Sequence, residues 1–196
     1  ESVRAALELC VSCKGCRREC PTGVDMAKMK IEALYQRRRT HGLPFRDRLI
    51  AHLPRWAPWA ARVPWLANLR NTLPGAAKLS EVWLGLSARR SLPAWRRDTF
   101  LRDAAVSRDD AASASADVVL FADTFTNYFE PENAHAALAV LGAAGHRVHV
   151  ARAVEADAEP SRPLCCGRTY LAAGLVDEAK SEARRVVAAL LPHVER

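Results

Sequence analysis

The sequence predicts a mainly α-helical N-terminal half followed by a small α/β domain with parallel strands. Two observations support this fold class. Residues 25–39 place apolar side chains at helical spacing directly after a cysteine-rich loop. Residues 117–152 contain a buried strand, a helix and a second strand, and such a unit favours parallel strands joined by a right-handed crossover. A chain of 196 residues can form one large domain or two small ones.

Helices are expected throughout the N-terminal half. Residues 1–9 predict a helix that leads into the cysteine-rich loop, and a second helix follows the loop, with Asp25 as its N-cap. Repeated prolines across residues 43–112 predict short helices separated by turns. The Ala- and Ser-rich residues 108–116 have the composition of a linker.

The C-terminal part has a clearer pattern. It predicts a strand over 117–123, a helix that begins near Pro131 and ends near Gly145, and a strand over 146–152. A strongly amphipathic helix is expected over 176–194. The GAAG sequence that ends at Gly145 fits a helix C-cap, and the sequence contains no phosphate-binding glycine motif, so no nucleotide site is expected.

Four of the six cysteines lie within eleven residues and have the spacing C-x2-C-x2-C-x3-C-P: Cys10, Cys13, Cys16 and Cys20. Disulfides are a poor explanation, because neighbouring thiols in so tight a loop are badly placed to pair. Structural zinc usually takes two separated pairs of Cys or His ligands, and no second pair of that kind follows. The spacing matches instead the bacterial ferredoxin pattern for a [4Fe–4S] cluster.

The ligand set of this cluster has two interpretations. In two-cluster ferredoxins the fourth Cys of such a run binds the other cluster. Cys10, Cys13 and Cys16 would then hold one cluster, and Cys20 would reach a second whose other ligands are missing from this sequence. Alternatively, Cys20 completes a single cluster. The chain starts within a helical pattern and without Met, which suggests a fragment of a longer polypeptide and favours the first interpretation.

Residues around the cysteines also suit a cluster. Gly15 allows the backbone to approach closely, and Pro21 ends the loop. The positive charges of Lys14, Arg17 and Arg18 are expected to offset the negative cluster and to favour its reduced form.

The net charge of +7 raises the question of a charged partner. Basic surfaces attract nucleic acid, anionic lipid or acidic proteins, but no nucleic-acid-binding motif accompanies the basic clusters, so solvated helix faces are favoured and no nucleic acid is expected. All five tryptophans lie between Trp56 and Trp95, interleaved with arginine. Packing is favoured for them, with peripheral membrane contact as the alternative. The sequence has no apolar stretch long enough for a transmembrane helix, and its polar first residues lead us to expect no signal peptide.

A second cysteine motif is the adjacent pair Cys165 and Cys166, followed by Gly167. Adjacent cysteines rarely bond to each other, and inert thiols are one interpretation. The pair also precedes an expected helix start, and a helix N-terminus lowers the pKa of a thiol. Cys165 and Cys166 are therefore secondary candidates for metal ligands.

Three stretches together resemble a known family: LCVSCKGCRRECPTGVDMAKMKIE, DTFTNYFEPENAHAALAVLGAAGHRV and RPLCCGRTYLAAGLVDEAKSEARR. They are similar to the iron–sulfur region of FAD-linked 2-hydroxy-acid oxidoreductases of the glycolate oxidase iron–sulfur subunit type, including the C-terminal part of fused FAD-linked oxidases. The resemblance covers nearly the whole chain. It is specific in the two cysteine motifs and loose in the Pro- and Trp-rich middle.

The resemblance implies three segments. Residues 1–42 would form an α-helical ferredoxin-like [4Fe–4S] segment, residues 43–112 a Pro/Trp-rich helical connector, and residues 113–196 a truncated, cysteine-rich CCG domain. The implied role is to relay electrons from a flavin-dependent 2-hydroxy-acid dehydrogenase, of glycolate or lactate type, to a downstream acceptor such as a quinone or another carrier. FAD is expected on a fused or partner dehydrogenase domain. The isolated chain is not expected to be catalytic, and no residue is assigned a catalytic role. The expected location is cytoplasmic, with peripheral contact at the inner membrane face as a further expectation.

Two departures from the family pattern support an alternative. Many CCG domains have a Cys after the first strand, where this chain has Thr124, and a further Cys segment that normally follows the CCG helix is missing before Arg196. Cys165 and Cys166 could then serve packing or partner contacts. The alternative function is a non-catalytic docking or scaffold domain of a redox complex that has lost part of its cluster binding.

Overall fold

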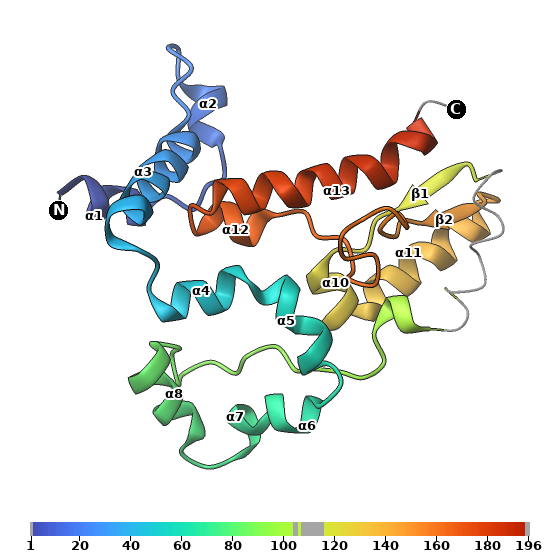
Figure 1. The fold of residues 1–196 in the computed structure, drawn as a ribbon, viewed down its shortest axis with the longest axis horizontal. Coiled ribbons are helices and arrows are strands. Elements are labelled where there is room, and N and C mark those ends of the chain that lie inside the picture. Colours follow the sequence, from blue (N-terminus) through green and yellow to red (C-terminus); the bar gives the residue numbers. More distant parts are fainter. Residues whose placement is uncertain (1, 104–105, 107–115, 195–196) are drawn as a thin grey trace.

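The computed structural model describes residues 2–103, 106 and 116–194. These residues are mainly helical and include one small two-stranded parallel sheet, which confirms the predicted fold class. The cysteine loop and the sheet lie at opposite ends of the long helix α13 (Val176–Val194) (Figure 1). Nearly all of the predicted linker at 108–116, and the predicted domain boundary after residue 112, lie outside the described residues.

The N-terminal helices surround the cysteine loop as predicted. They are α1 (Ser2–Glu8), α2 (Gly15–Glu19) and α3 (Met26–His41). The carboxylate of Asp25 accepts a hydrogen bond of 3.0 Å from the backbone N–H of Lys28, which confirms the predicted N-cap. The start of α3 is therefore fixed six residues after the last cysteine of the loop.

The connector consists of short helices, as its prolines predict. Pro54 and Pro64 lie in the first turns of two of them, where the missing backbone N–H has no cost. The helices of this region are α4 (Phe45–Ala51), α5 (Leu53–Ala60), α6 (Pro64–Ala67), α7 (Leu69–Thr72), α8 (Ala76–Leu84) and the 3₁₀ turn η1 (Phe100–Arg102). No helix in the described residues is long and apolar enough to cross a bilayer.

The tryptophans of the connector divide into two groups. The rings of Trp56 and Trp95 lie 5.0 Å apart, and Trp95 also packs against Tyr128. These two agree with the packing interpretation. The other three are largely exposed, with fractional exposures of 66%, 63% and 79%: Trp59, Trp65 and Trp83.

The predicted strand–helix–strand unit is present. Strands β1 (Val118–Leu120) and β2 (Val148–Val150) pair in parallel, with Val118 opposite Val148, and α11 (Pro131–Ala143) lies between them in sequence. Helix α11 ends as predicted, because Gly145 adopts a positive φ of 84° and the His146 N–H returns to the Leu141 carbonyl at 3.0 Å.

Both strands are shorter than predicted, and a helix that the sequence analysis missed explains the end of β1. Helix α10 (Thr124–Tyr128) begins at Asp123, whose carboxylate accepts a hydrogen bond of 2.8 Å from the backbone N–H of Thr126. The sequence DTFT carries this N-cap signal, but the apolar run before it suggested a strand as far as residue 123.

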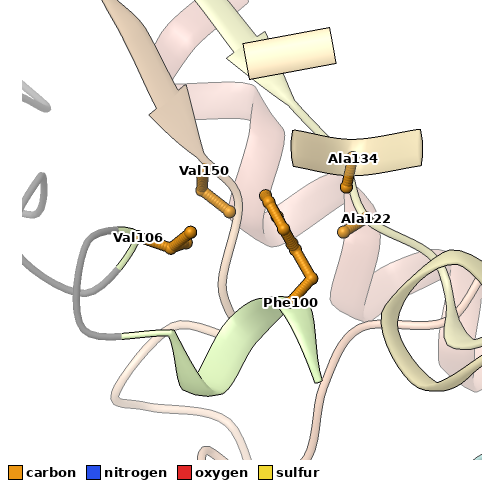
Figure 2. Packing of buried hydrophobic residues seen from close by; sticks show 5 residues of the cluster. All are labelled: Phe100, Val106, Ala122, Ala134 and Val150. Carbon is orange, nitrogen blue, oxygen red and sulfur yellow. The ribbon is translucent and has the colours of Figure 1, made fainter. Parts of the chain in front are cut away.

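The connector completes the core of the C-terminal part. Phe100 is fully buried between the end of β2 and α11, in a cluster with Val106, Ala122, Ala134 and Val150 (Figure 2). A second cluster joins α4 to α12 (Arg168–Ala172) and α13 and contains Ala51, Tyr170, Leu175 and Ala179. Apolar packing therefore crosses the predicted segment boundary after residue 112.

The N-terminal helices dock on the turn between α12 and α13. Gly174 in this turn has a φ of 71°, and a Cβ added to it would lie 2.8 Å from the backbone carbon of Leu34 in α3. The guanidinium of Arg38, also in α3, donates a hydrogen bond of 2.7 Å to the Gly174 carbonyl. Only glycine permits this backbone-to-backbone approach.

The docking can be tested by comparing Gly174→Ala with Gly145→Ala. Both glycines have a positive φ, so both variants carry a similar backbone strain. Only Gly174 has neighbours that a methyl group would overlap, since the space around Gly145 is open. We expect Gly174→Ala to lose about 2 kcal/mol more unfolding free energy than Gly145→Ala in urea titrations. Equal losses in the two variants would contradict the close contact.

Candidate functional site

The four clustered cysteines occupy one tight loop between α1 and α3. Cys10 follows α1, Cys13 lies in the loop, Cys16 is in the first turn of α2, and Cys20 ends α2 by donating its backbone N–H to the Cys16 carbonyl at 2.8 Å. The backbone reverses through two non-glycine residues with positive φ, at 59° and 60°: Ser12 and Lys14. Such conformations are uncommon for residues with a Cβ and concentrate at functional sites.

Hydrogen-bond donors approach two of these thiols. The backbone N–H of Met26 donates to the Cys16 sulfur at 3.4 Å, and the Cys20 sulfur lies 3.1 Å from the Thr22 hydroxyl. The Thr22 hydroxyl, followed by the backbone N–H of Val24, lowers the pKa of Cys20 to about 7. Both arrangements favour the thiolate, the form that binds metal. Sequence reasoning missed Thr22, although its position two residues after a cysteine was a usable signal.

The structure places the four predicted ligands on one loop but does not gather them into a closed set. In the part of the chain that is described, no three His, Cys, Asp or Glu side chains form a group that could hold a metal ion. Cys13 is exposed, and the other three are half-buried. The ligand set therefore stays a prediction, whereas the chemistry of the donors, thiols with nearby N–H and O–H groups, fits an iron–sulfur cluster.

The glycine of the cysteine loop lies at the start of a helix. Gly15 is the first residue of α2 and does not have a positive φ. A Cβ added to it would lie 3.6 Å from the Cys13 sulfur, an ordinary van der Waals distance. Gly15 therefore lies against the sulfur of one predicted ligand, and its predicted close approach to a cluster stays a prediction.

The second cysteine motif ends the long loop that precedes α12. Cys165 is buried with 2% exposure, whereas Cys166 is exposed. Gly167 has a φ of 74°, and a Cβ there would lie 3.1 Å from the Ala179 carbonyl oxygen in α13. Its backbone N–H donates to the Cys165 sulfur at 3.4 Å. Gly167 thus lets the motif pack directly on α13.

The two thiols of this motif differ in their acidity. A hydrogen bond with the Cys166 thiol, together with burial, raises the pKa of Cys165, and the same hydrogen bond lowers the pKa of Cys166. Thr124 also hydrogen-bonds Cys165. Thr124, which stands where the family resemblance predicts a cysteine, is thus in contact with Cys165. Its hydroxyl oxygen takes the place of the thiol that was expected there. Cys165 and Cys166 remain secondary ligand candidates.

The acidity of Cys166 predicts its reactivity. Because its pKa is lowered, its alkylation rate by iodoacetamide should reach half of its maximum below the value of about 8.5 that is usual for a free thiol. Cys165→Ala removes the donor and should move the midpoint upward. Tandem mass spectrometry of the peptide that contains both cysteines locates the label on Cys166 or on the adjacent Cys165. A midpoint at the usual value in both proteins would contradict the hydrogen-bonded pair.

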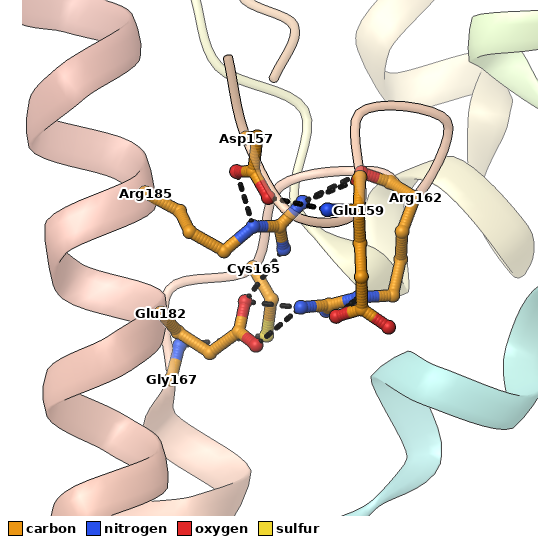
Figure 3. A network of polar contacts seen from close by, with 7 residues as sticks. All are labelled: Asp157, Glu159, Arg162, Cys165, Gly167, Glu182 and Arg185. Atoms are coloured by element: carbon orange, nitrogen blue, oxygen red, sulfur yellow. Dashed lines mark hydrogen bonds and ion pairs between the residues drawn. The ribbon is translucent and has the colours of Figure 1, made fainter. Parts of the chain in front are cut away.

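A buried network of ions holds the loop that carries this motif. Arg162 donates to the Glu182 carboxylate at 2.7 Å, and Arg185 binds Glu182 at 3.0 Å and Asp157 at 2.7 Å (Figure 3). Arg162 also binds Glu159 at 2.9 Å. Glu182 and Arg185 come from α13, and the other three come from the loop. Glu182–Arg185 and Glu159–Arg162 are each three residues apart, whereas the two pairs that join the loop to α13, Arg162–Glu182 and Asp157–Arg185, span 20 and 28 residues and could not be read from the sequence.

The ion network is expected to raise the unfolding free energy of the chain. Arg185→Ala leaves the Asp157 and Glu182 carboxylates without one of their cations and should reduce the unfolding free energy by about 3 kcal/mol. The neighbouring Arg184 is exposed, so Arg184→Ala should change it by no more than about 0.5 kcal/mol. Urea titrations measure both variants. Similar values for the two would show that the network does not stabilise the loop.

The cysteine loop faces the helix that follows the second cysteine motif. A cavity of about 330 Å³ separates the cysteine loop from α12, the helix that follows Cys165 and Cys166. Its lining includes Cys10, Lys14 and Lys30 on one side and Arg168 on the other. The Lys30 ammonium also donates to the Cys10 carbonyl at 2.7 Å, which ties α3 to the loop. The positive charges lie where an anionic cluster would be favoured.

Comparison with known proteins points to the same class of chemistry. The chain is 28% identical over 138 residues to D-2-hydroxyglutarate dehydrogenase of Escherichia coli, a match that covers 66% of the chain and 14% of that protein. It is 27% identical over 157 residues to the D-2-hydroxyglutarate dehydrogenase of Pseudomonas putida, covering 74% of the chain and 15% of that protein. The matched region is thus about a seventh of the length of these relatives.

These relatives set the coarse functional class. Both are dehydrogenases of a 2-hydroxy acid, and the chain is a distant homologue of a part of them. This agrees with the oxidoreductase class that the cysteine motifs suggested. No protein-family model matches the chain, and no solved structure matches it significantly.

Proposed function

We propose that the chain is an iron–sulfur electron-transfer module that relays electrons from a flavin-dependent 2-hydroxy-acid dehydrogenase to a downstream acceptor. The observation that carries the proposal is the four-cysteine loop, with its C-x2-C-x2-C-x3-C-P spacing and its thiolate-stabilising donors at Cys16 and Cys20. When bound, a [4Fe–4S] cluster supplies one-electron transfer. FAD belongs, in this proposal, to a fused or partner domain.

The residues of the chain have defined tasks in this proposal. Cys10, Cys13, Cys16 and Cys20 supply the thiolates, and the Met26 N–H and the Thr22 hydroxyl stabilise the charge on two of them. Lys14 and Lys30 place positive charge beside the loop. The exposed Cys13 leaves one side of the loop open to a redox partner.

The relatives support the substrate class. D-2-Hydroxyglutarate dehydrogenases oxidise a 2-hydroxy acid, as their name states, and the chain is similar to about a seventh of their length. Oxidation of a 2-hydroxy acid releases two electrons together, so a two-electron cofactor has to act before a one-electron carrier. The glycolate or lactate type expected from the sequence and the hydroxyglutarate type of the relatives share this chemistry.

One observation favours a second candidate function, a docking or scaffold domain with reduced cluster binding. Thr124 lies beside Cys165 at the position expected for a third thiol, so this second motif has only two cysteines. In this alternative, the CCG part packs against partners and the cysteine loop carries no redox role.

Two variants of the intact flavoenzyme distinguish these functions. Cys16→Ser should leave flavin reduction by D-2-hydroxyglutarate nearly unchanged, since that step precedes the relay, and should lower steady-state reduction of the acceptor at least tenfold. Stopped-flow absorbance and steady-state assays measure the two steps. The control Arg184→Ala, at an exposed position on α13 outside both cysteine motifs, should keep both. If Cys16→Ser impairs both steps equally while flavin stays bound, the relay assignment is wrong.

A further inference from the structure

The segment formed by residues 62–92, here called the connector lobe, has an unusual distribution of polarity. It contains α6, α7 and α8, and none of these helices has a fully buried residue. The lobe forms the lower edge of the molecule in Figure 1, apart from the sheet and the cysteine loop. A helical layer normally encloses its apolar side chains, and this one does not.

Polar contacts hold the inside of the lobe together. The Arg70 guanidinium donates to the Ser80 hydroxyl and to the Ser87 carbonyl, both at 2.7 Å. The Asn71 side chain forms two hydrogen bonds to the backbone of Leu92, at 2.7 and 3.1 Å. These contacts join α7 to α8 and to the segment after α8. The shape of the lobe therefore does not depend on an apolar core.

The apolar side chains of the connector lobe are exposed to solvent. Trp65 is 63% exposed, Leu79 61%, Val82 82% and Trp83 79%. Three further leucines of the lobe are also exposed: Leu66, Leu69 and Leu73. Exposed apolar surface of this extent usually marks a site of interaction with a protein or a membrane.

The charges around this surface have one sign. The lobe contains five Arg and Lys but a single acidic residue, Glu81. Lys78, Arg89 and Arg90 are exposed on the lobe. The Arg62 guanidinium stacks on the exposed Trp59 ring, 4.6 Å from its centroid. A surface that combines Trp, Leu and almost only positive charge complements a uniformly negative, amphipathic environment.

We propose that the connector lobe binds the surface of bilayers that contain anionic lipid. Trp65 and Trp83 would lie at the level of the headgroups, where amphipathic rings are favoured, and the cations would contact lipid phosphates. The contact is peripheral, because the helices of the lobe are too short to cross a bilayer.

Vesicle cosedimentation of the full chain tests this proposal. The chain should bind vesicles of phosphatidylcholine mixed with phosphatidylglycerol, and bind vesicles of phosphatidylcholine alone much more weakly. Arg89→Gln with Arg90→Gln should weaken binding to the mixed vesicles roughly 25-fold, about fivefold for each charge. Trp65→Ala with Trp83→Ala should weaken it at least about tenfold.

Matched controls keep the test specific. Lys180→Gln with Arg184→Gln removes the same charge from exposed positions on α13, and Val140→Ser with Val187→Ser removes exposed apolar groups outside the lobe. Both controls should bind within about twofold of the unchanged chain, since none of these residues belongs to the lobe. Circular dichroism confirms that each variant is folded.

Three outcomes would overturn the proposal: no binding of the folded chain to mixed vesicles, equal binding to vesicles without anionic lipid, or equal loss in lobe and control variants. Capture of an acidic protein by the lobe in place of vesicles would also overturn it, in favour of protein docking. Vesicle binding is measured without a redox partner, so its failure is distinct from a failure of the electron-transfer function.

Discussion

Two parts of the chain that are far apart in sequence meet at Gly174, and the relative position of the two cysteine motifs depends on this contact. The backbone of α3 approaches so closely that a single added Cβ would lie 2.8 Å from Leu34. Arg38 reinforces the approach with its hydrogen bond to the Gly174 carbonyl. Because α3 follows Cys20 and α12 follows Cys166, this contact helps to set the cysteine loop beside α12.

The two motifs are built differently. The four-cysteine loop is held by backbone turns and local hydrogen bonds, and its thiols are partly or fully exposed. The Cys165–Cys166 pair is held by the packing of Gly167 on α13 and by the ion pairs of Glu182. Thr124 hydrogen-bonds Cys165. The first arrangement suits a cluster that is incorporated into an open loop, and the second suits a rigid pair of thiols of unequal acidity.

Much of the architecture followed from local signals in the sequence. The Asp25 cap, the short proline-bounded helices and the parallel strand–helix–strand unit all rest on patterns within a few residues. The features that could not be predicted from the sequence depend on residues that are far apart along the chain. Nothing near Gly174 indicated that α3 would approach it, and the partners of Arg162 and Arg185 could not be paired from spacing alone. The strand end at Leu120 was missed because the Asp123 cap competes with an apolar run.

The central claim is that the cysteine loop binds an iron–sulfur cluster, and metal analysis of the anaerobically purified chain tests it most directly. The account predicts about four iron and four sulfide for each bound cluster, with broad visible absorbance that dithionite bleaches. The signal should disappear in Cys13→Ser, which removes one of the thiolates. A folded, colourless chain that contains zinc or no metal would contradict the account.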